Sequence, residues 1–302
     1  MRKNKKVSSV KRNFGFSNTI ILCILCLFVI IEIALLLWGL LTSLKTEIDF
    51  NWDKNTIGLP SGPIGTWGWD NFLHIFQEFE VEKPNGQYAY FLETIFNSLF
   101  YSISSAFLHV ASVVIVGYCV AKFNYRFSKF VYGLVLVMMT IPVIGTAPSM
   151  LVLLKKVLGI YDTWFSNFLM KFNFAGIYFL LMHAAFTRIP KDFSEAAAID
   201  GAGQFSIFIT IMIPMILPTV STIFLIYFID FWNDYNTALM YLPSHPTLAY
   251  GVFKLSVVNR ENKMNIPKRL VSCMIMVIPI LTLFLLFRNK IMGNVTSGGV
   301  KE

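Results

Sequence analysis

The sequence predicts an all-α protein that crosses a membrane six times. Its 302 residues are 56% hydrophobic and only 14% charged, whereas soluble domains carry about 25% charged residues. A bilayer core of about 30 Å needs about 20 apolar residues in a helix that rises about 1.5 Å per residue. Six apolar segments reach that length, at residues 20–42, 95–120, 130–154, 165–187, 207–229 and 270–288.

The distribution of charge predicts that both ends of the chain are cytoplasmic. A basic tail at residues 1–19 precedes the first transmembrane helix at 20–44, and positively charged flanks stay on the cytoplasmic side. Six crossings return the tail at 293–302 to that side. The acidic loop at 45–93 then lies outside the cell, and residues 94–292 form the rest of the membrane core.

One basic cluster conflicts with this topology. Lys254, Arg260, Lys263, Lys268 and Arg269 fall in the predicted outside loop before the last span. We retain the orientation because charges near the N-terminus usually dominate it. The first apolar run is also longer than the 7–15 residues typical of a signal peptide, so we expect an uncleaved span.

The outside loop contains a group of aromatic residues at helical spacing. Trp67, Trp69, Phe72, Phe76 and Phe79 predict a short amphipathic helix near the outer membrane surface. Trp and Tyr favour the headgroup level because the ring is apolar and its tip is polar. Two interpretations stay open for this helix, an interfacial anchor and a surface for a soluble outside partner.

The third span contains Pro142 and Pro148. Proline removes a backbone donor and kinks a helix, and a bundle tolerates this only where neighbours or water satisfy the freed carbonyls. Such a kink is either an ordinary feature of a span or part of a translocation route. The sequence leaves both interpretations open.

A few other polar groups lie within the apolar spans. Cys23 and Cys26 share a helix face, but no second Cys or His pair accompanies them, so we expect no metal site. Glu32 lies near the middle of the first span, where a charge is a functional candidate by default. It is expected to pair with His109 or His183, or to face a water-filled cavity. A proton relay there would indicate an ion-coupled secondary transporter.

The polar gap at residues 188–206 is predicted to form a short capped helix outside the membrane. Asp192 is a candidate N-cap, and Glu195 three residues later completes a pair like a capping box. The alanines at 196–198 favour a helix and let another surface approach closely. Gly201 can adopt the left-handed conformation that ends helices. A helix held by spans at both ends is suited to docking another protein.

This gap carries a recognisable motif. Glu195-Ala196-Ala197-Ala198-Ile199-Asp200-Gly201, followed after nine residues by Ile211-Met212-Ile213-Pro214, resembles the EAA loop of the permease subunits of bacterial ABC importers. That loop reads E-A-A-x-x-x-G, nine residues, then I-x-L-P, so only Ile213 departs from it. The resemblance implies a type I importer permease fold. It also implies a role in coupling to the ATPase for Asp192, Glu195, Ala196, Ala197, Asp200, Gly201 and Pro214.

The chain lacks the means to bind ATP itself. It contains no Gly-Lys dipeptide and so cannot form the G-x-x-x-x-G-K-[ST] phosphate loop. We therefore expect no cofactor in this chain and no enzymatic activity of its own. The resemblance implies two cytoplasmic ATPase subunits that bind ATP and Mg²⁺, a second permease forming a heterodimer, and an extracellular solute-binding protein. It implies a multi-pass protein of the bacterial cytoplasmic membrane with no nucleic-acid partner.

Further motifs resemble carbohydrate-type permeases. Trp69-Asp70-Asn71-Phe72 and Asn97-Ser98-Leu99 look like the elements beside the second span. Residues 228–235 are similar to the W-N-E-F element, with Asp234 in place of the usual Glu, and residues 293–301 resemble the glycine-rich tail of the G-type maltose permease subunit. Together they favour the uptake of an oligosaccharide. A permease for a non-sugar solute is the alternative.

Two groups of side chains are candidates for a substrate pathway. Sugar recognition combines aromatic faces with amides and carboxylates, which Trp232, Asn233 and Asp234 offer at the outer end of a span. Asn97 and Tyr101 lie on one face of the second span at helical spacing. Packing between helices and interhelical hydrogen bonding are the alternative roles for both groups.

Overall fold

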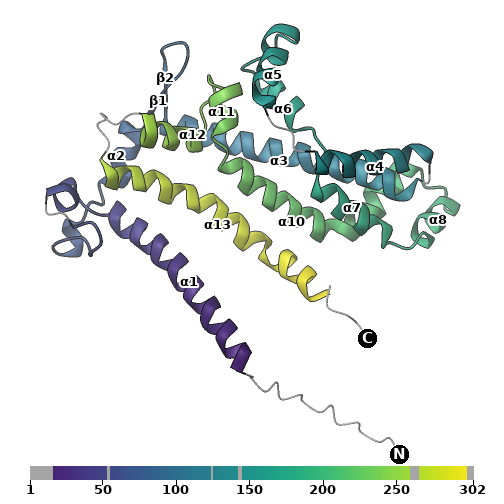
Figure 1. Cartoon of the computed structure of the whole chain (residues 1–302), viewed down its shortest axis with the longest axis horizontal. Coiled ribbons are helices and arrows are strands. Elements are labelled where there is room, and N and C mark those ends of the chain that lie inside the picture. Colours follow the sequence, from purple (N-terminus) through teal and green to yellow (C-terminus); the bar gives the residue numbers. More distant parts are fainter. Residues whose placement is uncertain (1–15, 53–54, 124, 142–144, 259–264, 298–302) are drawn as a thin grey trace, which may run out of the picture.

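The computed structural model is a bundle of long helices with a cap of short elements at one end (Figure 1). It describes residues 16–297 except 53–54, 124, 142–144 and 259–264. Among these residues, four helices are long and apolar enough to cross a membrane. They agree within a few residues with the first, second, fifth and sixth predicted spans, and run over Asn18–Ser43, Phe91–Lys122, Gln204–Trp232 and Ile266–Arg288.

The long helices pack side by side in a row that begins with α3 (Phe91–Lys122). Helix α3 contacts α7 (Ile177–Thr187) and α10 (Ile213–Trp232), and α10 in turn contacts α13 (Ile266–Ser297). Helix α1 (Phe16–Ser43) packs along α13 at the edge of the bundle, and most of its side chains are exposed. The start of α1 and the end of α13 point to the same end of the molecule, at the lower right of Figure 1.

The third predicted span is not one continuous helix. It consists of α4 (Arg126–Thr140), α5 (Thr146–Val152) and a π-helical turn (Leu153–Val157). Gly145 at the start of α5 has a φ of +78°, a left-handed conformation that interrupts a helix. Pro142 lies outside the described residues, and Pro148 occupies the first turn of α5, where its missing amide is tolerated.

The fourth predicted span is also divided, into α6 (Trp164–Lys171) and α7. The Asn173 side chain accepts a hydrogen bond of 3.0 Å from the backbone amide of Ala175, which forms a local turn that competes with the helix. Apolar composition predicted a continuous helix here. This was wrong, because the turn at Asn173 interrupts the helix although its neighbours are apolar.

The cap is built from the loop between α1 and α3. Its end of the bundle, which the sequence predicts to lie outside the cell, is named the outer end, and the opposite end is named the inner end. It contains α2 (Asn71–Glu78) and a two-stranded antiparallel hairpin, β1 (Glu80–Glu82) and β2 (Tyr88–Tyr90). The predicted amphipathic helix is present as α2, which packs Ile75 into the core with Phe79 directly after it, both fully buried, but Trp67 and Trp69 lie before the helix. Two short turns precede α2, a π-helical turn (Ile48–Trp52) and a 3₁₀ turn (Ile64–Thr66).

The apolar core is divided between the two ends of the bundle. The buried apolar residues form two clusters, one around Phe228 and Trp232 at the outer end and one around Phe179 and Met182 at the inner end. The remaining elements are short. They are α8 (Asp192–Ile199), α9 (Gln204–Ile207), α11 (Asn236–Tyr241), α12 (Leu248–Phe253) and two further π-helical turns (Phe208–Met212 and Lys254–Val258).

Candidate functional site

The predicted loop helix exists as α8, but it begins differently from the prediction. Lys191 occupies the N-cap position in a helical conformation (φ −66°, ψ −26°), and no side chain caps the helix. The prediction that Asp192 caps α8 through its side chain was therefore wrong. Because Lys191 is already helical, Asp192 and Glu195 fall within the first turn. Their negative charges there still favour the positive end of the helix dipole.

The end of α8 follows the prediction closely. Gly201 has a φ of +84°. The amide of Ala202 donates to the carbonyl of Ala197 at 2.9 Å, and the amide of Gly201 donates to the carbonyl of Ala198 at 3.1 Å. This pair of bonds is a Schellman motif, which satisfies carbonyls at a helix end and needs a left-handed residue. Glycine at this position fixes the direction in which the chain leaves α8 beyond Asp200.

The surface around α8 is unusually apolar for a helix outside the bundle. Ile199 is 86% exposed, Phe205 75% and Phe193 48%. The flanking Glu195 and Ala196 are also exposed. Exposed apolar groups rimmed by charges mark sites of protein association. This face of α8 therefore has the character of a docking surface.

The other side of α8 is tied to the inner end of the bundle. Lys122 at the end of α3 donates from Nζ to the carbonyl of Ile189 at 2.8 Å, and Ile189 belongs to the inner core cluster. Ala197 packs against the same cluster. On the far side of the loop, Pro214 opens α10 directly after the π-helical turn. The α8 loop is thus in direct contact with α3, and α9 and the π-helical turn connect α8 to α10.

The second candidate region centres on Asp234, just beyond the outer end of α10. Its Oδ2 accepts hydrogen bonds from the Tyr101 hydroxyl at 2.6 Å and from the Thr237 hydroxyl at 2.6 Å. Its Oδ1 accepts the backbone amide of Thr237 at 3.0 Å, at the start of α11. Lys171 of α6 completes the group, with Nζ at 3.4 Å from Oδ2. These four residues, the outer polar cluster, join α3, α6 and α11.

Lys171 is the member of this cluster that sequence reasoning missed. Its ammonium also lies over the Phe231 ring, at 4.5 Å from the centroid, and over the Tyr101 ring at 5.5 Å. Cation–π contacts of this kind are strongest away from water. The available signal was a lone lysine inside an apolar segment, which is costly at membrane depth unless a carboxylate pairs with it.

The other candidates for a substrate pathway serve mainly to hold helices together. Asn97 donates to the Pro246 carbonyl at 3.1 Å, and Trp232 is 1% exposed and donates from Nε1 to the Met276 carbonyl on α13 at 3.0 Å. Asn233 is exposed, and its amide donates to a carbonyl of α10 at 2.9 Å. Of the five candidates, Tyr101 and Asp234 are brought together and Asn233 faces outward.

The expected partners of Glu32 are not beside it. His109 packs against the Tyr227 ring, with centroids 4.1 Å apart, and His183 packs against the Tyr132 ring at 4.8 Å. Glu32 is exposed on α1, which contacts the bundle along α13. The predicted pairing with either histidine was wrong, because α1 lies at the edge of the bundle and the histidines lie within it.

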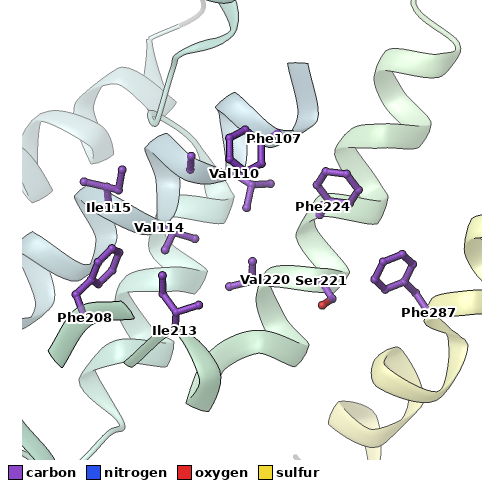
Figure 2. A pocket seen from close by; sticks show the side chains of 11 residues that line it. Phe107, Val110, Val114, Ile115, Phe208, Ile213, Val220, Ser221, Phe224 and Phe287 are labelled. Carbon is purple, nitrogen blue, oxygen red and sulfur yellow. The ribbon is translucent and has the colours of Figure 1, made fainter. Parts of the chain in front are cut away.

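An apolar cavity of about 420 Å³ lies between α3, α10 and α13 (Figure 2). Phe107, Val114, Phe224 and Phe287 are among its lining residues, and Ser221 provides its single hydroxyl group. A sugar needs a hydrogen-bond partner for each hydroxyl that it buries. This cavity therefore does not suit a sugar, and its lining matches lipid or an apolar helix.

The basic residues of the outer loop meet acidic partners in the cap. Lys268 at the start of α13 donates from Nζ to both carboxylate oxygens of Glu78 on α2, at 2.6 and 2.7 Å. Lys254 donates to the backbone carbonyl of Glu82 at 3.1 Å. Of the positive charges that conflicted with the topology, Lys268 thus pairs with a carboxylate of the acidic loop and Lys254 with a backbone carbonyl of that loop. Arg260 and Lys263 lie outside the described residues.

A family comparison decides the class of protein. Residues 113–295 match the family described as binding-protein-dependent transport system inner membrane component. The chain belongs to this family. The matched part of this permease includes α8, α10 and the end of α3 that contacts the α8 loop.

Individual relatives are also membrane components of transport systems. This permease is 23% identical over 88% of its length to the sulfoquinovosyl glycerol transport system permease SmoH of Agrobacterium fabrum, of which 87% is covered. It is 24% identical over 78% of its length to the maltodextrin transport system permease MdxG of Bacillus subtilis, of which 82% is covered. It is 29% identical over 68% of its length to the melibiose/raffinose/stachyose import permease MelC of the same species, of which 74% is covered.

A solved structure shares the fold of this permease. A chain of a bacterial ABC transporter that imports the acidic polysaccharide alginate superimposes with a TM-score of 0.68 at 21% identity. The match covers 95% of this permease and 99% of that chain. The overall fold of this permease is therefore that of the alginate transporter chain.

Proposed function

We propose that this permease is a transmembrane subunit of an ATP-driven ABC importer that takes up a carbohydrate. The observation that carries the proposal is the exposed helix α8, which ends in a glycine-dependent turn and contacts α3 and the inner core. Its outward face presents Ile199, and Phe205 is exposed on the adjoining helix α9. A transport protein of this family without a phosphate loop needs an ATPase partner, and α8 offers a surface for one.

The proposed chain of events runs from the ATPase through α8 to the spans. Two ATPase subunits bind ATP and Mg²⁺, and their closure displaces α8. The hydrogen bond from Lys122 to Ile189 and the packing of Ala197 pass this displacement to the bundle. The spans then open to the outside and receive the solute from an extracellular solute-binding protein.

We propose six crossings with both ends of the chain in the cytoplasm. The divided segments α4–α5 and α6–α7 supply the two crossings beyond the four long helices. The start of α1, the end of α13 and α8 lie away from the cap, spread apart from one another (Figure 1). The pairing of Lys268 with Glu78 supports an outside position for the remaining basic loop. Such a protein is a multi-pass component of the cytoplasmic membrane.

A second permease is proposed as the partner of the exposed helix α1. The apolar stretch of α1 is almost fully exposed in the single chain. Glu32 is also exposed there, and a carboxylate at membrane depth is costly unless a neighbour pairs with it. A heterodimer that places a polar group of the other permease beside Glu32 removes that cost.

The substrate class is inferred from the named relatives. Their names give maltodextrin, melibiose, raffinose, stachyose and sulfoquinovosyl glycerol as substrates, all of which contain sugar rings. In this chain, Asn233 presents an amide at the outer end of α10, beside the outer polar cluster. We assign Asn233 to the substrate pathway, and Tyr101 and Asp234 to positioning the helices around it.

Deletion of the gene, followed by uptake assays, tests this function. A panel of radiolabelled di- and oligosaccharides, together with polyamine, phosphate and amino acids, is offered to wild-type and deletion cells. We expect the deletion to abolish uptake of one carbohydrate class, and uptake in wild-type cells to fail when ATP is depleted with the proton gradient kept. Loss of a non-sugar solute, or uptake driven by the gradient alone, would contradict the proposal.

A further inference from the structure

A polar cavity with a positive charge opens at the inner end of the bundle. It has a volume of about 420 Å³ and lies between α3, α4 and α7, at the start of the α8 loop. Among the described residues, no carboxylate lines it. Its polar lining residues are Ser128, Lys129, Tyr132, His183, Thr187 and Lys191.

The hydrogen-bonding groups of this cavity are mostly donors. Lys129 and Lys191 have no ion-pair partner in the part of the chain that the structure describes. The Ser128 hydroxyl already donates to the Phe123 carbonyl at 2.6 Å, whereas the Tyr132 hydroxyl makes no described hydrogen bond. Two ammonium groups, a phenol and the His183 ring are thus free to donate. Phosphate oxygens accept hydrogen bonds and carry negative charge, so they fit this set.

The surroundings of the cavity point to a membrane lipid as the source of the phosphate. The first residues of α4 expose aromatic rings next to the cations, with Tyr125 at 64%, Phe127 at 71% and Phe130 at 62% exposure. Arg126 is exposed among them. Aromatic rings beside basic residues are typical of helix ends at the headgroup level. A soluble partner gains little from rings that are directed at lipid.

We propose that this cavity binds the headgroup of an anionic phospholipid from the cytoplasmic leaflet. Basic pockets between transmembrane helices on the cytoplasmic side bind such headgroups. Lys129 and Lys191 neutralise the phosphate, and Tyr132 and His183 donate hydrogen bonds to it. The acyl chains lie along the exposed rings of Phe127 and Phe130.

This site also bears on the coupling loop. Lys191 directly precedes α8, and Thr187 is the last residue of α7, so a bound headgroup bridges α4 to the hinge of the loop. The importer should therefore depend on anionic lipid for coupling. This consequence rests on the proposed function, including the cytoplasmic position of the start of α4.

Lipid retention tests the site directly. The transporter is purified through a tag on this chain from its native membrane, and phosphatidylglycerol bound after detergent washing is counted by native mass spectrometry. We expect Lys129→Gln/Lys191→Gln to bind phosphatidylglycerol at least about tenfold more weakly. The charge-preserving Lys129→Arg/Lys191→Arg retains the lipid. Lys155→Gln/Lys156→Gln, the same charge change beyond α5, has no effect.

Three results would overturn the site. The first is equal retention of phosphatidylglycerol by the wild type and a folded Lys129→Gln/Lys191→Gln variant. The second is retention of phosphatidylcholine by the wild type as strong as that of phosphatidylglycerol. The third is displacement of the lipid by millimolar inorganic phosphate. Labelling of Arg126→Cys by an impermeant maleimide on intact cells would contradict the topology. Lipid binding with no sugar uptake would contradict only the proposed function, and sugar uptake without lipid selectivity would contradict only the site.

Discussion

Asp234 at the outer end and α8 at the inner end differ in how completely the chain around them satisfies or covers their side chains. At the outer end, Asp234 accepts three short hydrogen bonds and has Lys171 beside it. At the inner end, Ile199 is 86% exposed on a helix that no other part of the described chain covers on that side. This difference indicates that contacts within the chain stabilise the outer polar cluster. The inner end is shaped to be completed by another protein.

The largest expected effect comes from the turn that ends α8. Gly201→Val places a β-branched side chain at a φ of +84°, which costs about 1–2 kcal/mol and redirects the chain beyond α8. No atom lies within 4 Å of the added Cβ, so the effect is one of backbone conformation and not of a clash. We expect uptake to be abolished while the amount of protein in the membrane is unchanged, measured by transport assay and immunoblot.

A neighbouring glycine supplies the matched control. Gly203 has a φ of −71°, which suits any residue, and open space around its Cβ position. Gly203→Val should therefore keep most of the uptake. Equal loss in both variants would mean that the loop tolerates no added bulk, and the conformational account of Gly201 would be wrong.

The next largest effect is expected at the outer polar cluster. Lys171→Met leaves the carboxylate of Asp234 buried without its counter-charge, which costs about 3 kcal/mol for a buried pair. We expect a lower melting temperature in detergent. The double variant Lys171→Met/Asp234→Asn should recover much of the lost melting temperature, because it leaves no unpaired charge buried. Comparison of the double variant with the single variants gives the coupling energy of the pair.

A surface pair serves as the comparison for that variant. Lys83 and Glu93 form an ion pair of 2.6 Å at the foot of the hairpin, where the Lys83 side chain is 14% exposed and the Glu93 side chain 42%, so the Glu93 carboxylate stays in contact with solvent when Lys83 is removed. Exposed pairs contribute about 0–1 kcal/mol, so Lys83→Met should hardly change the melting temperature. A drop as large as that of Lys171→Met would remove the distinction between the two pairs.

A smaller effect is expected from Asp49 in the cap. Burial raises the pKa of Asp49, but hydrogen bonds from Ser61 and Asn55 and the charge of Lys45 outweigh it, so the net pKa is lowered. A lowered pKa stabilises the folded state above the unfolded value near 3.9, and this stability is lost as the pH falls through the folded value. The wild type should therefore lose melting temperature on acidification below about pH 4.

The variant Asp49→Asn isolates this contribution. In the wild type, Ser61 donates to Asp49 from both its backbone amide and its hydroxyl. The side-chain NH₂ of an asparagine is itself a donor, so it cannot accept one of these two hydrogen bonds. We expect a loss of about 2 kcal/mol at neutral pH, from charged hydrogen bonds, and a weaker dependence of melting temperature on pH between 3 and 7. An unchanged pH dependence would mean that other carboxylates determine the acid stability.

The smallest effect is expected from Tyr101→Phe. It removes one donor to Asp234 and leaves the donors of Thr237 and the charge of Lys171 in place. The expected loss is about 1 kcal/mol, with transport largely retained if Tyr101 positions helices. A strong loss of uptake without a loss of melting temperature would instead make Tyr101 a direct contact of the substrate.

Features that depend on near neighbours in the chain could be predicted from the sequence. The apolar length of α1, α3, α10 and α13, and the glycine that ends α8, follow from local physics. The partner of Asp234 could not be predicted, because Lys171 lies 63 residues away. The start of α8 was misjudged by one residue, since Lys191 takes a helical conformation that its sequence does not signal.

The central claim is that the exposed face of α8 docks an ATPase. Affinity purification from native membranes with wild-type protein and with Ile199→Asp tests it most directly. The side chain of Ile199 is almost fully exposed, so the change should leave the fold intact. We predict that an ATPase subunit co-purifies with the wild type and is lost with Ile199→Asp, while the second permease stays bound to both. Equal recovery of the ATPase with both proteins, or its absence from both, would contradict the account.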